Sequence, residues 1–176
     1  MPGPVRMVAI AVAAALLGVG TAAARDGAPR ATAVTVACDR IVLRERTGAE
    51  DGFRIVLGAV SMPGATHLAR EVELSRGRVW PYYRNAGIAV RAGSSAVAVS
   101  VPVGWRDRVA LSWGDSPAVS ALRFAPCAGS AAGSWNAYSG GIHLRLRGDC
   151  VPLHVRVGGM STTVRVGVGR ACGSAG

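Results

Sequence analysis

Apolar and polar residues alternate with period two through most of this chain, a pattern typical of half-buried β-strands. Gly, Pro, Asp and Ser separate the alternating runs and favour turns between them. The runs lie at 32–38, 52–60, 87–92, 95–101, 108–113, 118–124, 142–147 and within 150–172. About eight to ten short strands predict an all-β fold, a small β-sandwich of Ig-like or jelly-roll-like type, with a barrel as the alternative.

Local signals sharpen this prediction at three places. Gly93 and Ser94 separate two runs and predict a hairpin of 87–92 with 95–101, whereas 52–60 is expected to form one continuous strand. The stretch 65–76 contains good helix formers, yet part of it also alternates, so helix and strand both stay open there. At most one short helix is therefore expected.

The segment 150–172 makes the most specific structural prediction. If Gly158-Gly159 form a two-residue turn, Leu153 faces Val164 and Val151 faces Val166, so the apolar sets of both strands coincide. A register slip of one residue would place valine beside arginine throughout. This segment is therefore predicted to form a hairpin with one apolar and one polar face.

The N-terminus has the order of a secretory signal peptide. A basic start is followed by an unbroken apolar run from Met7, which ends in small residues just before Arg25. Residues 1–24 are predicted to be cleaved, although an uncleaved anchor is the alternative. The mature chain, 25–176, is then one disulfide-stabilised β domain, secreted or held at the cell envelope, without a membrane span.

An even number of cysteines in an exported chain favours disulfides over free thiols. The four are Cys38, Cys127, Cys150 and Cys172, and no two have the C-x-x-C spacing of a redox or zinc motif. The hairpin favours Cys150–Cys172, which leaves Cys38–Cys127. Pairing of Cys127 with Cys150 and of Cys38 with Cys172 is the alternative.

The charge balance adds a class of partner. All 20 basic residues are arginine, against 10 acidic residues, for a net charge of +10. Codon bias in a GC-rich genome explains arginine in place of lysine, but not the excess, which favours binding to polyanions. Export makes anionic envelope polymers or acidic lipid headgroups better candidates than intracellular nucleic acid.

Some of the basic residues alternate with apolar residues along the predicted strands. In 142–147, Ile142, Leu144 and Leu146 are expected to point inward, and the intervening residues outward. If this strand shares a sheet with the hairpin, one surface carries the candidate polyanion-binding residues His143, Arg145, Arg147, His154, Arg156 and Arg165. A solvated face, as on any half-exposed sheet, is the other interpretation.

Two aromatic residues are candidates for stacking against a sugar or base. Trp135 and Tyr138 lie just before the basic run, where aromatic rings beside arginines would suit such a ligand. Isolated Trp and Tyr in a small β domain more often fill the core or cover its ends, and burial is the favoured interpretation for Trp135.

No catalytic or metal-binding constellation is recognisable. Gly114-Asp115-Ser116 is similar to the nucleophile block of Gly-Asp-Ser esterases, but the Asp-x-x-His that must accompany it is missing. His67, His143 and His154 lack metal-ligand spacing. We therefore expect no cofactor and no metal.

Several longer stretches carry a family resemblance: WNAYSGGIHLRLRGDCVPLHVRVGG, WPYYRNAGIAVRAG and VGWRDRVALSWG. They resemble a family of exported β-rich proteins of high-GC Gram-positive bacteria, and the resemblance covers most of the mature chain. It implies export and assigns no functional residue.

Together these observations predict a non-catalytic exported module for binding or assembly at the cell envelope. Its Arg/His-rich face would contact an anionic polymer or a partner protein. The alternative is a secreted hydrolase of envelope material, which would need Asp, His or Ser residues from distant parts of the sequence to meet in a cleft.

Overall fold

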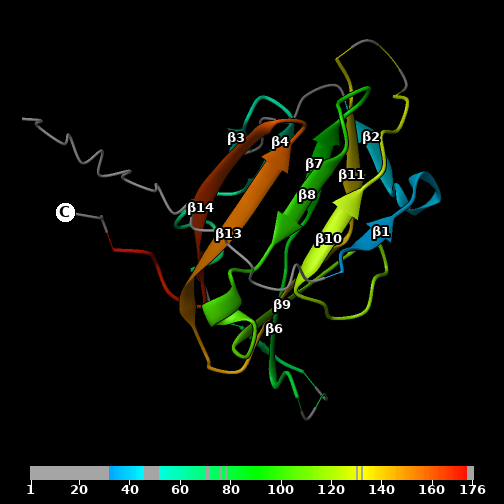
Figure 1. Ribbon diagram of the computed structural model, residues 1–176. Helices are drawn as coiled ribbons and strands as arrows, with labels where there is room; N and C mark the ends of the chain where they lie inside the picture. The colour runs from blue at the N-terminus through cyan, green and yellow to red at the C-terminus, as the bar shows by residue number, and fades with distance from the viewer. Residues whose placement is uncertain are drawn as a thin grey trace, which may run out of the picture.

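The described residues of the computed structural model, 32–45, 52–69, 72–75, 77, 79–129, 131 and 133–173, contain strands and two short 3₁₀ turns. The predicted signal peptide, 1–24, lies outside them. The turns are η1 (Cys38–Arg40) and η2 (Val103–Trp105), and no longer helix occurs in the part of the chain that is described. The all-β prediction is confirmed, and the arrangement is a sandwich without a closed barrel (Figure 1).

One layer of the sandwich, which we name the front sheet, has five strands and faces the viewer in Figure 1. Across the sheet they are β1 (Val34–Val36), β10 (Ala121–Phe124), β8 (Val97–Ser100), β13 (Asp149–Val157) and β14 (Met160–Val168). All neighbours are antiparallel except β1 and β10, which run parallel.

The other layer consists of two sheets. The upper back sheet contains, in order, β2 (Leu43–Glu45), β11 (Trp135–Tyr138), β7 (Ile88–Arg91), β4 (Val60–Pro63) and β3 (Phe53–Val56). The lower back sheet contains β5 (Glu73–Leu74), β6 (Tyr82–Asn85), β12 (Gly140–Leu144) and β9 (Val109–Trp113).

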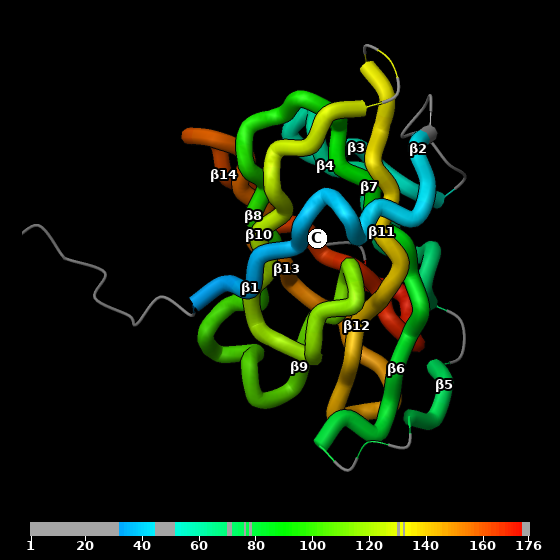
Figure 2. The backbone as a smooth tube through the Cα atoms, turned by 90° about the vertical axis from the view of Figure 1, so that its right-hand side faces the viewer, coloured from blue at the N-terminus to red at the C-terminus, as the bar shows by residue number. Residues whose placement is uncertain are grey.

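The two back sheets are joined by strands that run through both. Ile88 pairs with Tyr138 in the upper sheet and Arg84 pairs with Ile142 in the lower one, which is the same register on both sides of the break. The amide of Ala86 also donates to the backbone oxygen of Gly140, 2.8 Å away. Figure 2 shows the backbone running on from β6 into β7 and from β11 into β12, so the two back sheets adjoin as one bent layer.

Glycine permits the bend. Gly140 has φ +137°, a conformation that other residues rarely adopt, and an added Cβ would overlap the backbone oxygen of Ser112. An added Cβ at Gly141 would overlap the backbone oxygen of Arg84. The close approach of β9 and β6 to β12 therefore requires both glycines.

The core lies between the layers and is built from the inward side of each alternating strand. On β13 the inward residues Val151, Leu153 and Val155 are all 0% exposed. The largest buried side chains are Trp113, Tyr138 and Phe124. The rings of Phe124 and Tyr138 meet at 4.9 Å between centroids, across the two layers.

The predicted C-terminal hairpin is confirmed in its register. Leu153 pairs with Val164 and Val151 with Val166, on either side of the Gly158-Gly159 turn. Both predicted disulfides are formed: Cys150 with Cys172, and Cys38 with Cys127. The Cys38–Cys127 disulfide joins η1 to the segment that follows β10.

Two local predictions were wrong. Residues 52–60 form two strands, β3 and β4, because the chain turns at Leu57 and Gly58, which both have positive φ. Residues 87–92 and 95–101 do not pair with each other. β7 belongs to the upper back sheet and β8 to the front sheet, so Gly93, with φ +71°, lies where the chain crosses between layers.

The undecided stretch 65–76 contains no helix in its described residues. Leu68 is buried and forms a bridge with Val168, and Glu73–Leu74 is the edge strand β5. No helix in the described residues is long and apolar enough to cross a membrane.

Candidate anion-binding surface

The six predicted polyanion-binding residues do not share one surface. The strand after Ser139, β12, pairs with β6 and β9 in the lower back sheet, whereas β13 and β14 belong to the front sheet. The alternation also ends early: β12 ends at Leu144, and Leu146, expected to point inward, is 57% exposed. The connection 145–148 carries the chain from one layer to the other, so the predicted face is divided.

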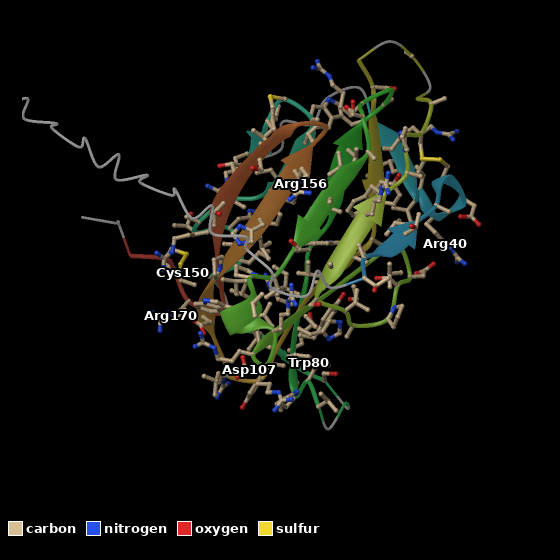
Figure 3. All side chains as sticks on the ribbon, viewed as in Figure 1. Arg40, Trp80, Asp107, Cys150, Arg156 and Arg170 are labelled. Carbon is tan, nitrogen blue, oxygen red and sulfur yellow. A yellow bond between two sulfur atoms is a disulfide. The ribbon has the colours of Figure 1, made fainter. Side chains whose placement is uncertain are left out.

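Two of the predicted residues, both on the hairpin, form one wall of a hollow on the front sheet. His154 and Arg156 point outward from β13 and are exposed, and Figure 3 labels Arg156 over this sheet. In register they lie beside two small residues of β8: His154 pairs with Ser100, and Arg156 with Ala98. Because the side chains of β8 are so short here, the outer surface dips between its neighbours.

The floor continues onto the next strand. Ala121 of β10 pairs with Ser100, so the floor consists of Ala98, Ser100 and Ala121. Arg123, exposed and paired with Ala98, stands on β10 beside this floor. The hollow has a volume of about 580 Å³, and we name it the front trough.

One end of the front trough is lined by Arg106, which follows η2. Its Nε donates to the backbone oxygen of Val101, 3.4 Å away, which fixes the base of the guanidinium. On the hairpin side, His154 Nδ1 lies 2.8 Å from Thr163 Oγ1 on β14, which orients the ring. The residues that line the trough include no acidic side chain.

Arg165 lies on the same outer face but outside the trough, beside Pro152 at the edge of the sheet. Its Nε is 3.3 Å from Cys150 Sγ, and its backbone oxygen accepts a hydrogen bond of 2.6 Å from Arg54. Burial lowers the pKa of Arg54. Arg165 thus lies over the Cys150–Cys172 disulfide and belongs to the margin of the basic surface.

His143 occupies a different environment, on the outer face of the lower back sheet. Its Nε2 is 2.7 Å from Ser112 Oγ, and its ring lies 4.7 Å from that of Tyr83 between centroids. Burial lowers the pKa of His143 and raises that of Tyr83. A hollow of about 550 Å³ beside this pair is lined by Ser112 and Tyr83, together with Glu73 and Asp115.

This pair lacks the third group of a catalytic triad. The described contacts of His143 are with Ser112 and Tyr83, and neither is a carboxylate that could orient the imidazole. In the sheet, Glu73 pairs with Tyr83 and is separated from His143 by the whole of strand β6. Ser112 and His143 therefore form a polar contact between diagonal positions of β9 and β12, whereas Thr163 and His154 lie directly opposite each other.

The two candidate stacking residues, Trp135 and Tyr138, are 4% and 1% exposed, as the core interpretation expects. The Tyr138 hydroxyl points to the disulfide, 3.7 Å from Cys127 Sγ, and its ring packs on Phe124. Arg91 lies over the Trp135 ring, 5.7 Å from its centroid. Tyr138 thus belongs to the core between the layers, whereas Trp135 is buried on the other side of β11, beside Arg91.

Arg145 and Arg147 lie in the connection after β12, away from the front trough. The guanidinium of Arg145 is 5.6 Å from the ring centroid of Trp80, and Arg147 lies near Arg170 beside a hollow of about 490 Å³.

Arg106, Arg123 and Trp105 were not among the predicted site residues. Alternation in 118–124 does mark Arg123 as outward, but only the register with β8 places it beside the trough.

Comparison with protein families, with curated proteins and with solved structures finds no match for this chain. In the part of the chain that the structure describes, no three His, Cys, Asp or Glu side chains gather as metal ligands would. The two disulfides are typical of secreted or extracellular proteins. The protein is thus defined by its fold, a disulfide-linked β-sandwich, and by a basic trough on the front sheet.

Proposed function

We propose that this protein is an exported module that binds a phosphate- or carboxylate-bearing polymer of the cell envelope in the front trough. One observation supports this most directly: a floor of small residues is lined by Arg106 and Arg156, with Arg123 beside it, and the lining contains no carboxylate. The predicted signal peptide and the two disulfides support an extracytoplasmic location.

The trough suits an extended anionic chain for two physical reasons. The floor of Ala98, Ser100 and Ala121 lets a ligand approach the strands closely, and the planar forks of Arg106 and Arg156 can each bind two oxygens of a phosphate or carboxylate. Side chains of Ser100, His154 and Thr163 supply further polar atoms along the same surface. Affinity would come from several modest, salt-sensitive contacts.

The proposal is tested by binding of the protein, recovered from its own cells, to immobilised poly(glycerol phosphate). Neutral dextran is the control ligand. We expect retention at low salt and a linear fall of log affinity with log salt concentration. Arg156→Gln should weaken binding about tenfold and reduce the salt slope by about one.

A matched variant separates the trough from net charge. Arg44→Gln removes an exposed arginine from β2, in the upper back sheet, and changes the total charge equally. It should leave most of the affinity intact. Absence of retention at low salt, or equal losses in both variants, would reject the front trough as the site.

A secreted hydrolase is the second candidate function, and the 2.7 Å contact of Ser112 Oγ with His143 Nε2 favours it. Neutral imidazole is the form that accepts a proton from serine, and burial keeps His143 neutral at neutral pH. Covalent labelling by a fluorophosphonate probe, lost in Ser112→Ala, would support the hydrolase. We expect no labelling, since nothing described orients the imidazole.

A further inference from the structure

A second surface, at one end of the sandwich, combines exposed apolar side chains with arginines. In the lower back sheet, Leu144 pairs with both Tyr82 and Val109, so these residues form one row at the end of the sheet. The connections 79–81, 103–108 and 145–148 leave the strands beside this row. We name them together the basal end; Figure 3 labels Trp80 and Asp107 there, at the bottom of the molecule.

Each of the three connections presents a large apolar side chain to solvent. Val79, Val103 and Leu146 are each 57% exposed, and Leu74, paired with Tyr82 on the edge strand, is 80% exposed. These are four of the eight exposed large apolar side chains in the described residues. We name Val79, Val103 and Leu146 the apolar tips. Exposed apolar side chains that gather at one end of a protein mark a contact surface, whereas single exposed apolar side chains are common on any protein.

Behind the tips lie two partly exposed tryptophans, each covered by an arginine. Arg145 lies over Trp80, at 5.6 Å from the ring centroid, and Arg108 over Trp105, at 3.9 Å. The amide of Arg145 donates to the backbone oxygen of Arg108, 3.0 Å away, so the two Trp/Arg pairs are joined through the backbone. Tryptophan prefers the boundary between water and hydrocarbon, and stacked arginine can still bind phosphate.

The charge of this end is positive. Among the described residues, five arginines lie on or beside it, against three carboxylates: Glu73 next to Leu74, Asp107, and Asp149, which is 3.8 Å from Arg108. The arginines are Arg106, Arg108, Arg145, Arg147 and Arg170. Arg106 also lines the front trough, and the other four do not.

We infer that the basal end docks onto the surface of a bilayer that contains anionic lipids. Val79, Val103 and Leu146 enter the headgroup region, Trp80 and Trp105 lie at the boundary, and the arginines bind lipid phosphates. A bilayer fits better than a protein partner because the apolar tips stand on three separate connections with arginines between them, rather than forming one continuous groove. Apolar insertion and attraction to anionic lipid then act together, as in peripheral membrane proteins.

The direct test is co-sedimentation of the protein, recovered from its own cells, with vesicles of phosphatidylglycerol and phosphatidylcholine, compared with phosphatidylcholine alone. We expect binding to the anionic vesicles that weakens as salt increases. The double variant Val79→Ser/Leu146→Ser should bind at least about tenfold more weakly, because two apolar side chains no longer leave water.

Met160→Ser is the matched control. Met160 is 55% exposed at the tip of the β13–β14 hairpin, the opposite end of β13 from Asp149, so this variant loses a comparable apolar side chain elsewhere. It should bind vesicles like the unaltered protein. Vesicle binding that is insensitive to the double variant would assign the interaction to another segment and overturn the inference.

Tryptophan fluorescence provides an independent measurement. Trp113 and Trp135 are 0% and 4% exposed, so brominated lipid should quench mainly Trp80 and Trp105. We expect quenching by anionic vesicles that falls in Trp80→Phe and in Trp105→Phe. Equal binding to neutral vesicles would contradict the requirement for anionic lipid. Binding without quenching would contradict contact through the basal end and overturn the inference.

Discussion

The Nε1 of Trp113 donates a hydrogen bond to the backbone oxygen of Ala86, 2.7 Å away, inside a core where the indole is 0% exposed. This bond joins β9 to the point where β6 passes into β7. Both its donor and its acceptor are withdrawn from water, so neither has another partner to replace it. The indole thus helps to hold the bend of the back layer that Gly140 and Gly141 permit.

Trp113→Phe should therefore lower the free energy of unfolding by about 2–4 kcal/mol, through an unpaired carbonyl and a cavity. Denaturant unfolding measures this change. The comparison variant is Trp105→Phe, at a half-buried ring on η2 that contacts Arg108. It should cost about 1 kcal/mol or less, and equal losses in both variants would contradict the prediction.

Gly140→Ala should destabilise the protein by about 3 kcal/mol or more. The new methyl would overlap the backbone oxygen of Ser112, and φ +137° is strained for any residue with a Cβ. Gly159→Ala is the control, since a methyl there meets open space in the hairpin turn. Thermal unfolding of both variants should show a large decrease in Tm only for Gly140→Ala.

Replacing each disulfide by two serines should destabilise by different amounts. The Cys38–Cys127 disulfide spans 89 residues and Cys150–Cys172 spans 22, so chain-entropy arguments give losses of about 4.5 and about 3 kcal/mol. Denaturant unfolding ranks the two double variants. Non-reducing peptide mapping of the unaltered protein should recover these two pairs, and mixed pairs would refute the connectivity.

Stability should fall as the pH drops below about 6.5, partly because of His143. Burial lowers its pKa in the folded protein below the ordinary value of 6.5, so at mildly acid pH the unfolded chain binds a proton that the folded protein does not. Above that pH both states are neutral and the contribution is complete. Unfolding measured at several pH values should show a shallower acid loss in His143→Gln than in the unaltered protein, and an equal slope in both would contradict the prediction.

Prediction from the sequence was accurate where a strand pairs with its neighbour in the sequence, and it failed where a strand pairs with distant ones. The hairpin of β13 and β14 was predictable to the residue because Gly158-Gly159 sets its register and the valines of both strands must face the same way. The same reasoning failed at Gly93 and Ser94, since Val97 pairs with Phe124 and Val157, both far away in the sequence. Leu57 concealed the turn at 57–58, because an apolar residue with positive φ gives no sequence signal of a turn.

The basic surface was only half predictable for the same reason. Alternation identified His154 and Arg156 as outward, but their function as a wall depends on lying beside Ser100 and Ala98. That arrangement depends on the register between β8 and β13, which cannot be predicted from any short stretch of the sequence. For Trp135 the sequence left both stacking and burial open, because the composition of its neighbours gives no indication that the strand is covered on both sides, and the ring is 4% exposed.

The order of strands in the front sheet also constrains when the protein can assemble. β8 lies at the centre of this sheet, and both its neighbours, β10 and β13, come later in the sequence. β1, first in the sequence, has no partner in the sheet until β10 is present, and β14 closes the other edge only at the end. Because long-range pairing must wait for its partners, we expect the growing chain to lack a complete front sheet until β13 and β14 are present, with its apolar residues exposed to chaperones and proteases until then.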